Sequence, residues 1–93
     1  MYAEAFLILF AMYKVYILHS RKLDRYYVGY TRDIDRRIKE HNRRKGKYTD
    51  GGIPWELVFI EEYETKASAM QREKYIKSQK SRDFIQSLLG ERR

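Results

Sequence analysis

The 93-residue sequence contains no cysteine and only one proline. Without cysteine it can form neither a disulfide nor a thiolate metal site, so a reducing, cytoplasmic setting is the simpler expectation. The apolar run over residues 5–11 is much shorter than the roughly 20 residues that span a bilayer, and no basic residue precedes it as in a signal peptide. We therefore expect no membrane partner. Residues 1–11 are expected to form an N-terminal extension, or a first turn packed on the sheet, ahead of a single domain over residues 12–90.

Acidic residues are outnumbered, and the excess positive charge is concentrated in one place. The chain carries 20 Lys and Arg against 13 Asp and Glu, for a net charge of +7 and a pI near 9.7. Residues 32–47 alone hold eight basic and three acidic side chains, a net charge of +5. A solvated helix face explains such a stretch in many proteins. Here it follows directly on a tyrosine-rich segment, which favours a phosphate-facing patch and a nucleic acid as the partner.

Short β-rich segments alternate with helical patterns along the chain. Residues 14–18 and 26–31 are rich in β-branched and aromatic side chains, which predicts two strands joined by a hairpin connection over residues 19–25. Asp33 or Thr31 is expected to cap a first helix, in which Ile34 and Ile38 share one face and which ends between Asn42 and Gly46.

The second half of the chain repeats the alternation once. A loop over residues 47–54 precedes a third strand over residues 55–63, and a helix is expected from Thr65. Ser81 is expected to cap a last helix that ends near Gly90. The order β-β-α-β-α-α predicts an α+β fold, a small three-stranded antiparallel sheet flanked by helices.

Tyrosine is frequent, and the second predicted strand contains a glycine. Of the nine tyrosines, Tyr26 and Tyr30 point to the face opposite Tyr27, and we assign these two a structural role. Tyr16 on the first strand and Tyr27 on the second are candidate neighbours across the hairpin, although each taken alone is more typical of a core residue than of a catalytic one. Gly29 indicates either a tight packing contact or a close approach of a ligand.

Two helical positions supply groups suited to phosphate chemistry. Arg37 and His41 lie four residues apart, on the flank of the apolar face. A guanidinium can hold a phosphate through two parallel hydrogen bonds, and a histidine can exchange a proton near neutral pH. A surface arginine and a solitary histidine are the plain alternatives.

Glu73 is an isolated carboxylate on the packing side of a predicted helix, between Ala69 and Ile76. A carboxylate at such a position is costly unless it is paired or bound to metal. A salt bridge to a nearby Lys or Arg is one explanation. The other is Mg²⁺, which typically takes one or two protein carboxylates and completes its shell with water and substrate oxygens.

Together these residues resemble the GIY-YIG nuclease family. Val15-Tyr16 and Tyr27-Val28-Gly29 match its two-part signature, over a resemblance that extends across roughly residues 12–82. The match is closest to the small stand-alone bacterial (YhbQ-like) members, and the combination of motifs is more specific than the short signature alone.

Three further positions match the family's pattern, and one departs from it. Arg37, eight residues after Gly29, falls at the position of the catalytic arginine, and Glu73 at that of the metal-binding glutamate. His41 falls where the family has His or Tyr. Lys14 replaces the glycine of the first motif, a position that supplies backbone more than chemistry.

The resemblance implies a one-metal endonuclease that hydrolyses phosphodiester bonds of nucleic acid, with DNA as the expected partner and Mg²⁺ or Mn²⁺ as cofactor. Glu73 would hold the metal, Arg37 would brace the scissile phosphate, and Tyr16 would take a proton from the attacking water with help from His41 or Tyr27. Flanking phosphates would be held by basic side chains, namely Arg36, Arg43, Arg44, Lys45, Lys47, Lys77 and Lys80.

Two non-enzymatic hypotheses compete with the nuclease. The same surface would serve a nucleic-acid-binding module whose tyrosines stack bases. The second hypothesis is a structural or protein-interaction domain that has kept the fold and lost catalytic activity. Nothing in the sequence identifies its protein partner. Glu73 separates the nuclease from the binding module, because a pure binding surface gains nothing from a carboxylate among its cations.

Overall fold

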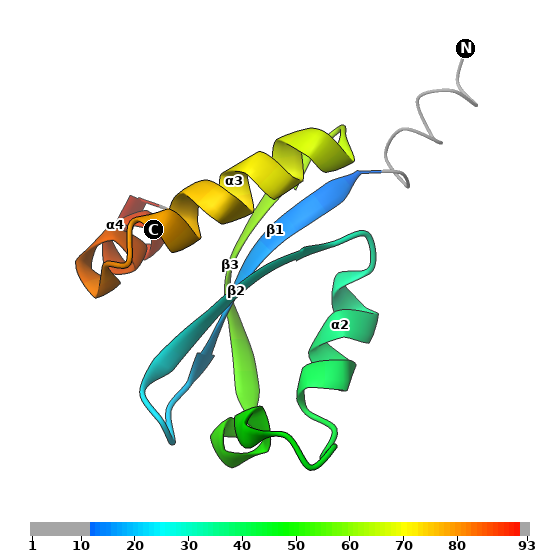
Figure 1. The fold of residues 1–93 in the computed structure, drawn as a ribbon, viewed down its shortest axis with the longest axis vertical. Helices are drawn as coiled ribbons and strands as arrows, with labels where there is room; N and C mark the ends of the chain where they lie inside the picture. Colours follow the sequence, from blue (N-terminus) through cyan, green and yellow to red (C-terminus); the bar gives the residue numbers. More distant parts are fainter. Residues whose placement is uncertain (1–11, 92–93) are drawn as a thin grey trace.

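The computed structural model describes residues 12–91, which form a three-stranded antiparallel sheet with helices on both faces (Figure 1). Residues 1–11, for which an N-terminal extension or a first turn was predicted, lie outside this range. In chain order the elements are β1 (Tyr13–Ser20), β2 (Arg25–Thr31), α2 (Ile34–His41), the 3₁₀ helix η1 (Tyr48–Gly52), β3 (Trp55–Tyr63), α3 (Lys66–Ser78) and α4 (Arg82–Glu91). The predicted fold class and element order are confirmed.

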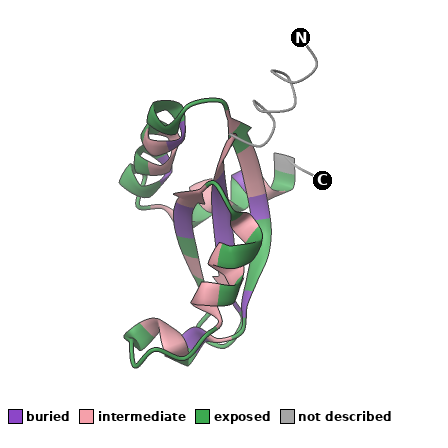
Figure 2. Cartoon of the chain, turned by 90° about the vertical axis from the view of Figure 1, so that its right-hand side faces the viewer, coloured by how far each residue is buried: buried purple, intermediate pink, exposed green. Residues whose placement is uncertain are grey.

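β1 is the central strand, with β2 on one side and β3 on the other. Residues Val15, Tyr16, Ile17 and Leu18 are all buried, because helices cover both faces of this strand (Figure 2). The strand order leaves one edge of β2 and one edge of β3 without a hydrogen-bonded neighbour in residues 12–91.

The two faces of the sheet carry separate core clusters. On one face α3 and α4 pack over Val15, Ile17, Val28 and Phe59. On the other face Tyr16, Leu18 and Trp55 form a smaller cluster, against which Ile34 and Ile38 of α2 pack. The apolar stripe predicted for α2 is therefore its packing face, and the adjacent stripe with Arg37 and His41 lies at the margin of that packing.

Side-chain caps set the helix starts. Asp33 accepts a hydrogen bond from the backbone N–H of Arg36 at 3.1 Å, so Asp33 and not Thr31 is the N-cap of α2. Thr65 caps α3 by accepting from Ser68, and the Ser81 hydroxyl accepts from Phe84 at the start of α4. The predicted caps at Asp33 and Ser81 are confirmed.

Two predicted boundaries were wrong. The hairpin connection spans only residues 21–24, because His19 pairs with Tyr26 and Ser20 with Arg25 in the β1–β2 ladder. Polar side chains are tolerated at this end of the sheet, and the Ser20 hydroxyl closes the turn by accepting from the Leu23 N–H. Part of the predicted loop over residues 47–54 is the 3₁₀ helix η1.

None of the helices in residues 12–91 is both long enough and apolar enough to cross a membrane.

Candidate active site

Residues predicted from distant parts of the chain meet around one cavity at the free edge of β2. The cavity has a volume of about 380 Å³, and its walls include Tyr16, Tyr27, Gly29, Arg37 and Glu73. Tyr16 comes from β1, Arg37 from α2 on one face of the sheet, and Glu73 from α3 on the other (Figure 1). We call this space the edge cavity.

Tyr16 supplies a buried phenol to the edge cavity. Its side chain is 2% exposed, and its hydroxyl lies 3.1 Å from Nε2 of His41. Burial raises the pKa of the Tyr16 phenol well above its usual value, the neighbouring Tyr27 adds to the rise, and Arg37 opposes it. The phenol therefore holds its proton at neutral pH and donates it in a hydrogen bond.

His41 is the acceptor for that proton. It does not line the edge cavity itself, and its hydrogen bond to a residue that does is the one to the Tyr16 hydroxyl. Burial lowers the pKa of His41, and the positive charges of Lys45 and Arg37 lower it further. The imidazole is therefore neutral at neutral pH, and its Nε2 can accept from Tyr16. The His41 ring also meets the Tyr27 ring at 4.4 Å between centroids, nearly edge to face, which fixes its orientation.

Gly29 makes room for the Tyr16 phenol. The two residues are paired across the β1–β2 ladder, and the Tyr16 side chain lies over the glycine. A Cβ atom added at Gly29 would sit 2.5 Å from the Tyr16 hydroxyl oxygen and 2.7 Å from Cζ. Of the two readings of this strand glycine, the structure therefore supports a tight packing contact, and the group in contact is the candidate catalytic phenol.

Gly29→Ala is expected to lower the free energy of unfolding by about 1–3 kcal/mol, the usual range for overpacking a tight site. It should also move the Tyr16 hydroxyl away from His41. Urea unfolding measures the first effect, and the histidine ring signals in an NMR spectrum report the second. Gly51→Ala is the matched control, because nothing lies within 4 Å of a Cβ at Gly51. Equal stability of both variants would contradict the packing account.

Arg37 reaches the edge cavity from α2, one helical turn before His41. Its side chain is about 43% exposed, and one guanidinium nitrogen lies 3.5 Å from Glu40 Oε2. A contact of that length at a solvated surface is weak. The guanidinium can therefore turn its planar donor fork to a phosphate entering the cavity.

Glu73 lies on the opposite wall, half-buried at 16% side-chain exposure. It shares a face of α3 with the buried residues Ala69 and Ile76, as the sequence pattern indicated. Its Oε1 lies 3.4 Å from Lys77 Nζ, so the salt-bridge explanation of Glu73 holds in part. The ion pair does not remove Glu73 from the cavity wall, where the carboxylate charge helps to raise the pKa of Tyr16.

The oxygen atoms around Glu73 suit a hard divalent cation. Within residues 12–91 no group of three or more His, Cys, Asp or Glu side chains could hold a metal on its own. The edge cavity instead offers one carboxylate and several hydroxyl groups. That donor set fits Mg²⁺ or Mn²⁺ completed by water and substrate oxygens, and does not fit a soft metal.

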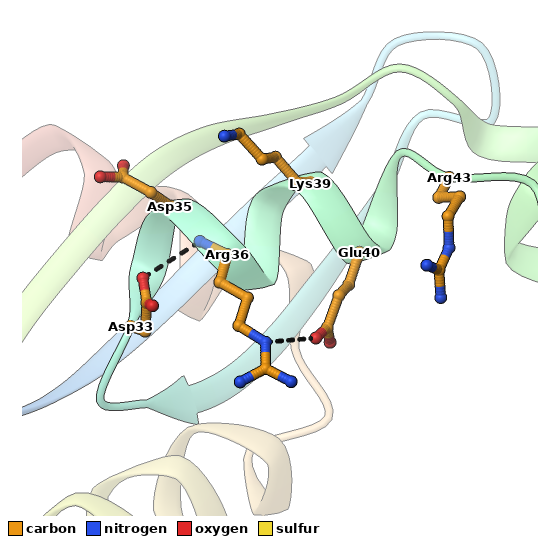
Figure 3. A pocket seen from close by; sticks show the side chains of 6 residues that line it. All are labelled: Asp33, Asp35, Arg36, Lys39, Glu40 and Arg43. Carbon is orange, nitrogen blue, oxygen red and sulfur yellow. Dashed lines mark hydrogen bonds and ion pairs between the residues drawn. The ribbon is translucent and has the colours of Figure 1, made fainter.

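None of the seven basic residues predicted to bind flanking phosphates lines the edge cavity, although Arg36 shares a neighbouring hollow with Arg32 and Arg37. Arg36 and Arg43 line a hollow on the outer side of α2, together with Lys39, Asp33 and other acidic side chains (Figure 3). Arg36 donates to Glu40 at 3.1 Å there. This hollow is larger than the edge cavity, but it has mixed charge and no tyrosine, so it is a flanking surface and not the site.

The remaining predicted basic residues occupy two other places. Arg44, Lys45 and Lys47 are exposed in the loop after α2. The Asp50 carboxylate orders this loop by accepting from the backbone N–H groups of Lys45 and Gly46, both at 2.8 Å. Lys77 and Lys80 line another hollow, which shares Tyr27 with the edge cavity.

Five residues that line the edge cavity were not predicted as site residues: Tyr13, Tyr30, Thr31, Arg32 and Lys66. Tyr30 also packs against the larger core cluster, as its structural assignment requires. Arg32 stands over the Tyr13 ring, 5.4 Å from its centroid. Lys66 precedes Glu73 by two helical turns, so the spacing on α3 contained a signal for it.

Comparisons with known proteins identify the family of this chain. A family model described as the GIY-YIG catalytic domain matches residues 12–86. The chain is 51% identical over 53 residues to the UPF0213 protein YazA of Bacillus subtilis, a match that covers 56% of this chain and 54% of that protein. It is 43% identical over 67 residues to the UPF0213 protein VNG_2274C of Halobacterium salinarum, covering 71% and 86%. Against the first relatives found, the chain spans only 54–62% of their length.

A solved structure shares the arrangement. The solution NMR structure of the UPF0213 protein BH0048 from Bacillus halodurans is 40% identical, with a TM-score of 0.55. The match covers 85% of this chain and 83% of that one. The predicted resemblance is confirmed by the family match and by these relatives.

Proposed function

The chain belongs to the GIY-YIG family, and we propose that it is a metal-dependent endonuclease that hydrolyses phosphodiester bonds in nucleic acid, with DNA as the expected substrate. The observation that carries this proposal is the meeting of Tyr16, Arg37 and Glu73 around one cavity, with His41 bonded to the phenol. A proton acceptor, a phosphate clamp and a metal-binding carboxylate are the parts that hydrolysis requires.

Proton transfer would run through Tyr16 to His41. A water attacks the phosphorus, and its proton passes to the Tyr16 oxygen as the phenol proton passes to neutral Nε2 of His41. The raised pKa of Tyr16 argues against a free phenolate as the base, so the imidazole is the final acceptor. The bond from phosphorus to the 3′ oxygen breaks, and the leaving oxygen takes a proton from solvent.

Arg37 would hold the scissile phosphate through its donor fork and offset charge that builds on the non-bridging oxygens. Glu73 would hold Mg²⁺ or Mn²⁺, which supplies positive charge at the phosphate and at the leaving oxygen. Before a metal ion binds, the ion pair with Lys77 would balance the negative charge of the half-buried Glu73 carboxylate.

The exposed basic side chains would bind the strand on either side of the cut. They would act as sequence-independent phosphate contacts, so affinity should fall steeply with salt. The residues are Arg36 and Arg43 beside α2, Arg44, Lys45 and Lys47 in the following loop, and Lys77 and Lys80 near the edge cavity.

The function is tested by nicking of plasmid and end-labelled oligonucleotides in Mg²⁺ or Mn²⁺, with EDTA as the blank. Arg37→Ala should lower the cleavage rate constant about 10²–10³-fold, the loss seen when one preorganised donor to a developing anion is removed. Arg21→Ala is the matched control, because Arg21 lies in the hairpin turn and pairs only weakly with Glu56, at 3.5 Å. Binding without cutting under every divalent ion would favour the binding-module hypothesis.

The pH dependence should report His41. Because neutral imidazole is the acceptor, the cleavage rate constant should be level through neutral pH and fall as pH drops below the folded pKa of His41. Burial and the nearby cations place that pKa below its ordinary value of about 6.5. His41→Gln should be slower and should lack this acid limb. His19→Gln, in the hairpin, should keep the wild-type profile, and an unchanged acid limb in His41→Gln would exclude His41 as the acceptor.

A further inference from the structure

Asn42, the residue that follows α2, bonds through its side chain to the first residue of β3. Its Nδ2 donates to the Trp55 carbonyl oxygen at 3.0 Å, and its Oδ1 accepts from the Trp55 N–H at 2.6 Å. In an antiparallel ladder a residue exchanges both of these backbone bonds with the residue opposite. The Asn42 amide therefore takes the place of a neighbouring strand. We call this pair of bonds the amide bridge.

The amide bridge joins two residues that are 13 apart in the sequence. The chain reaches β3 from the end of α2 only through the following loop and η1 (Figure 1). Asn42 is half-buried, and Trp55 is 5% exposed. An unpaired backbone N–H or C=O at such a place is costly. Asparagine carries a donor and an acceptor on one short side chain, so removing either atom leaves a Trp55 backbone group without this partner.

Trp55 is itself held from other sides. It lies opposite Ser20 in the β1–β3 ladder, and its indole N–H donates to the Thr49 carbonyl oxygen at 2.9 Å. A Cβ atom at Gly52 would lie 2.6 Å from the indole ring, so the ring packs directly on the glycine backbone. The amide bridge therefore ties the end of α2 to a residue whose position is fixed.

His41 lies next to Asn42 and is held through the same tryptophan. Its ring meets the Tyr27 ring at 4.4 Å, and the Tyr27 ring meets the Trp55 ring at 6.4 Å, between centroids in each case. The link through the Asn42 amide and the link through the Tyr27 ring thus start from Trp55 and end on adjacent residues. Between them they hold His41 with its Nε2 at 3.1 Å from the Tyr16 hydroxyl.

The end of α2 needs an anchor because this helix is short. It has eight residues, none of which is buried, and it packs on the sheet through Ile34 and Ile38. A helix of this length is marginal on its own, and helix ends fray first. His41 is the last residue of α2, so fraying there moves the imidazole away from the phenol. Because a proton is transferred only within hydrogen-bond reach, the position of this helix end controls the proposed transfer.

We propose that Asn42 is a positioning residue of the candidate active site, whose amide bridge holds the His41 imidazole within hydrogen-bond reach of the Tyr16 hydroxyl. The inference rests on the proposed function, in which that imidazole receives the proton. Asn42 does not line the edge cavity, so it acts through His41 and not on the substrate.

Asn42→Ala removes the amide bridge and should slow single-turnover cleavage about 10- to 100-fold, the loss that follows a misplacement of about 1 Å. Its affinity for the same oligonucleotide in EDTA should be unchanged. Ile53→Ala is the matched control, because Ile53 packs against the core cluster that contains Trp55 and takes no part in the bridge. It should lose stability in urea and keep the wild-type rate while folded. Equal rate losses in the two folded variants would reduce Asn42 to a structural residue.

NMR of the free protein tests the positioning without cleavage. In Asn42→Ala the His41 ring should become more exposed. Its pKa should then rise toward the ordinary value, because burial is the main cause of the lowered pKa. The acid limb of the cleavage profile should move to higher pH with it, and neither should move in Ile53→Ala. The titratable and charged groups that face the ring are the same in both variants, namely Tyr16, Tyr27, Arg37, Glu40 and Lys45.

If Asn42→Ala does not fold, Asn42→Asp decides. A carboxylate keeps the acceptor for the Trp55 N–H and loses the donor to the Trp55 carbonyl oxygen. This variant should cleave more slowly than wild type at a pH above the acid limb. A wild-type rate in the variant that folds would overturn the inference and leave the nuclease standing. A raised His41 pKa in Asn42→Ala, in a protein that cuts nothing under any divalent ion, would support the placing of His41 by Asn42 and overturn the nuclease.

Discussion

Replacing Glu73 by glutamine is expected to lower the cleavage rate constant about 10³-fold or more while single-strand affinity in EDTA stays within a few-fold of wild type. The glutamine keeps the size of the side chain and the packing beside Ala69 and Ile76. It removes the negative charge that would hold Mg²⁺ or Mn²⁺, and charge stabilisation by such an ion contributes several kcal/mol to the barrier. At 1.36 kcal/mol for each factor of ten, several kcal/mol corresponds to about three orders of magnitude.

The loss should be specific to the metal role of the carboxylate. In wild type, Mn²⁺ is expected to broaden the NMR signals of residues around the edge cavity, including Gly29 and Glu73, and this broadening should vanish in Glu73→Gln. Glu62→Gln changes the same charge at an exposed position on β3 and is the matched control. If Glu73→Gln cut as fast as Glu62→Gln, the carboxylate would be only the partner of Lys77.

Replacing Tyr16 by phenylalanine is the second large effect, an expected loss of about 10²–10⁴-fold in the cleavage rate constant, which is the usual contribution of a positioned proton-transfer group. The ring remains in the smaller core cluster with Leu18 and Trp55, so the fold is kept. The lost hydrogen bond to His41 should cost about 1 kcal/mol of stability. That small cost cannot explain a rate loss of several orders of magnitude.

The measurement pairs single-turnover cleavage with urea unfolding. The matched control is Tyr48→Phe, since Tyr48 is 81% exposed. Tyr48→Phe should leave both quantities unchanged. A Tyr16→Phe variant that retained the wild-type rate would remove the phenol from the proton path and leave His41 without its link to the cavity.

The fold could be predicted from the sequence because local signals and packing agree over most of it. The β-branched and aromatic runs marked the strands, and Asp33 and Ser81 marked helix starts whose hydroxyl or carboxylate does accept from the backbone. Errors arose where tertiary pairing outweighs composition. His19 and Ser20 are polar yet belong to β1, because the ladder with Tyr26 and Arg25 continues through them.

Five of the ten residues that line the edge cavity were named from the sequence, but the sequence could not show how neighbouring side chains are separated in space. Arg36 and Arg37 are adjacent in the sequence and were both expected at phosphate, but one residue along a helix is a rotation of about 100°. Arg37 therefore lines the edge cavity, whereas Arg36 lines only hollows beside it, one of which it shares with Arg37. The reason for Gly29 is likewise tertiary, since it depends on the register that places it opposite Tyr16.

Cleavage in H₂¹⁸O with mass spectrometry of the products tests the central claim most directly. If water activated through Tyr16 and His41 attacks a phosphate held by Arg37, a single strand incubated with Mg²⁺ should yield a 3′ hydroxyl on one fragment and, on the other, a 5′ phosphate with one ¹⁸O. The same fragments should be missing with EDTA and with Glu73→Gln. A 3′ phosphate, a lasting phosphotyrosine link to the protein, or intact strands under every divalent ion would contradict the account.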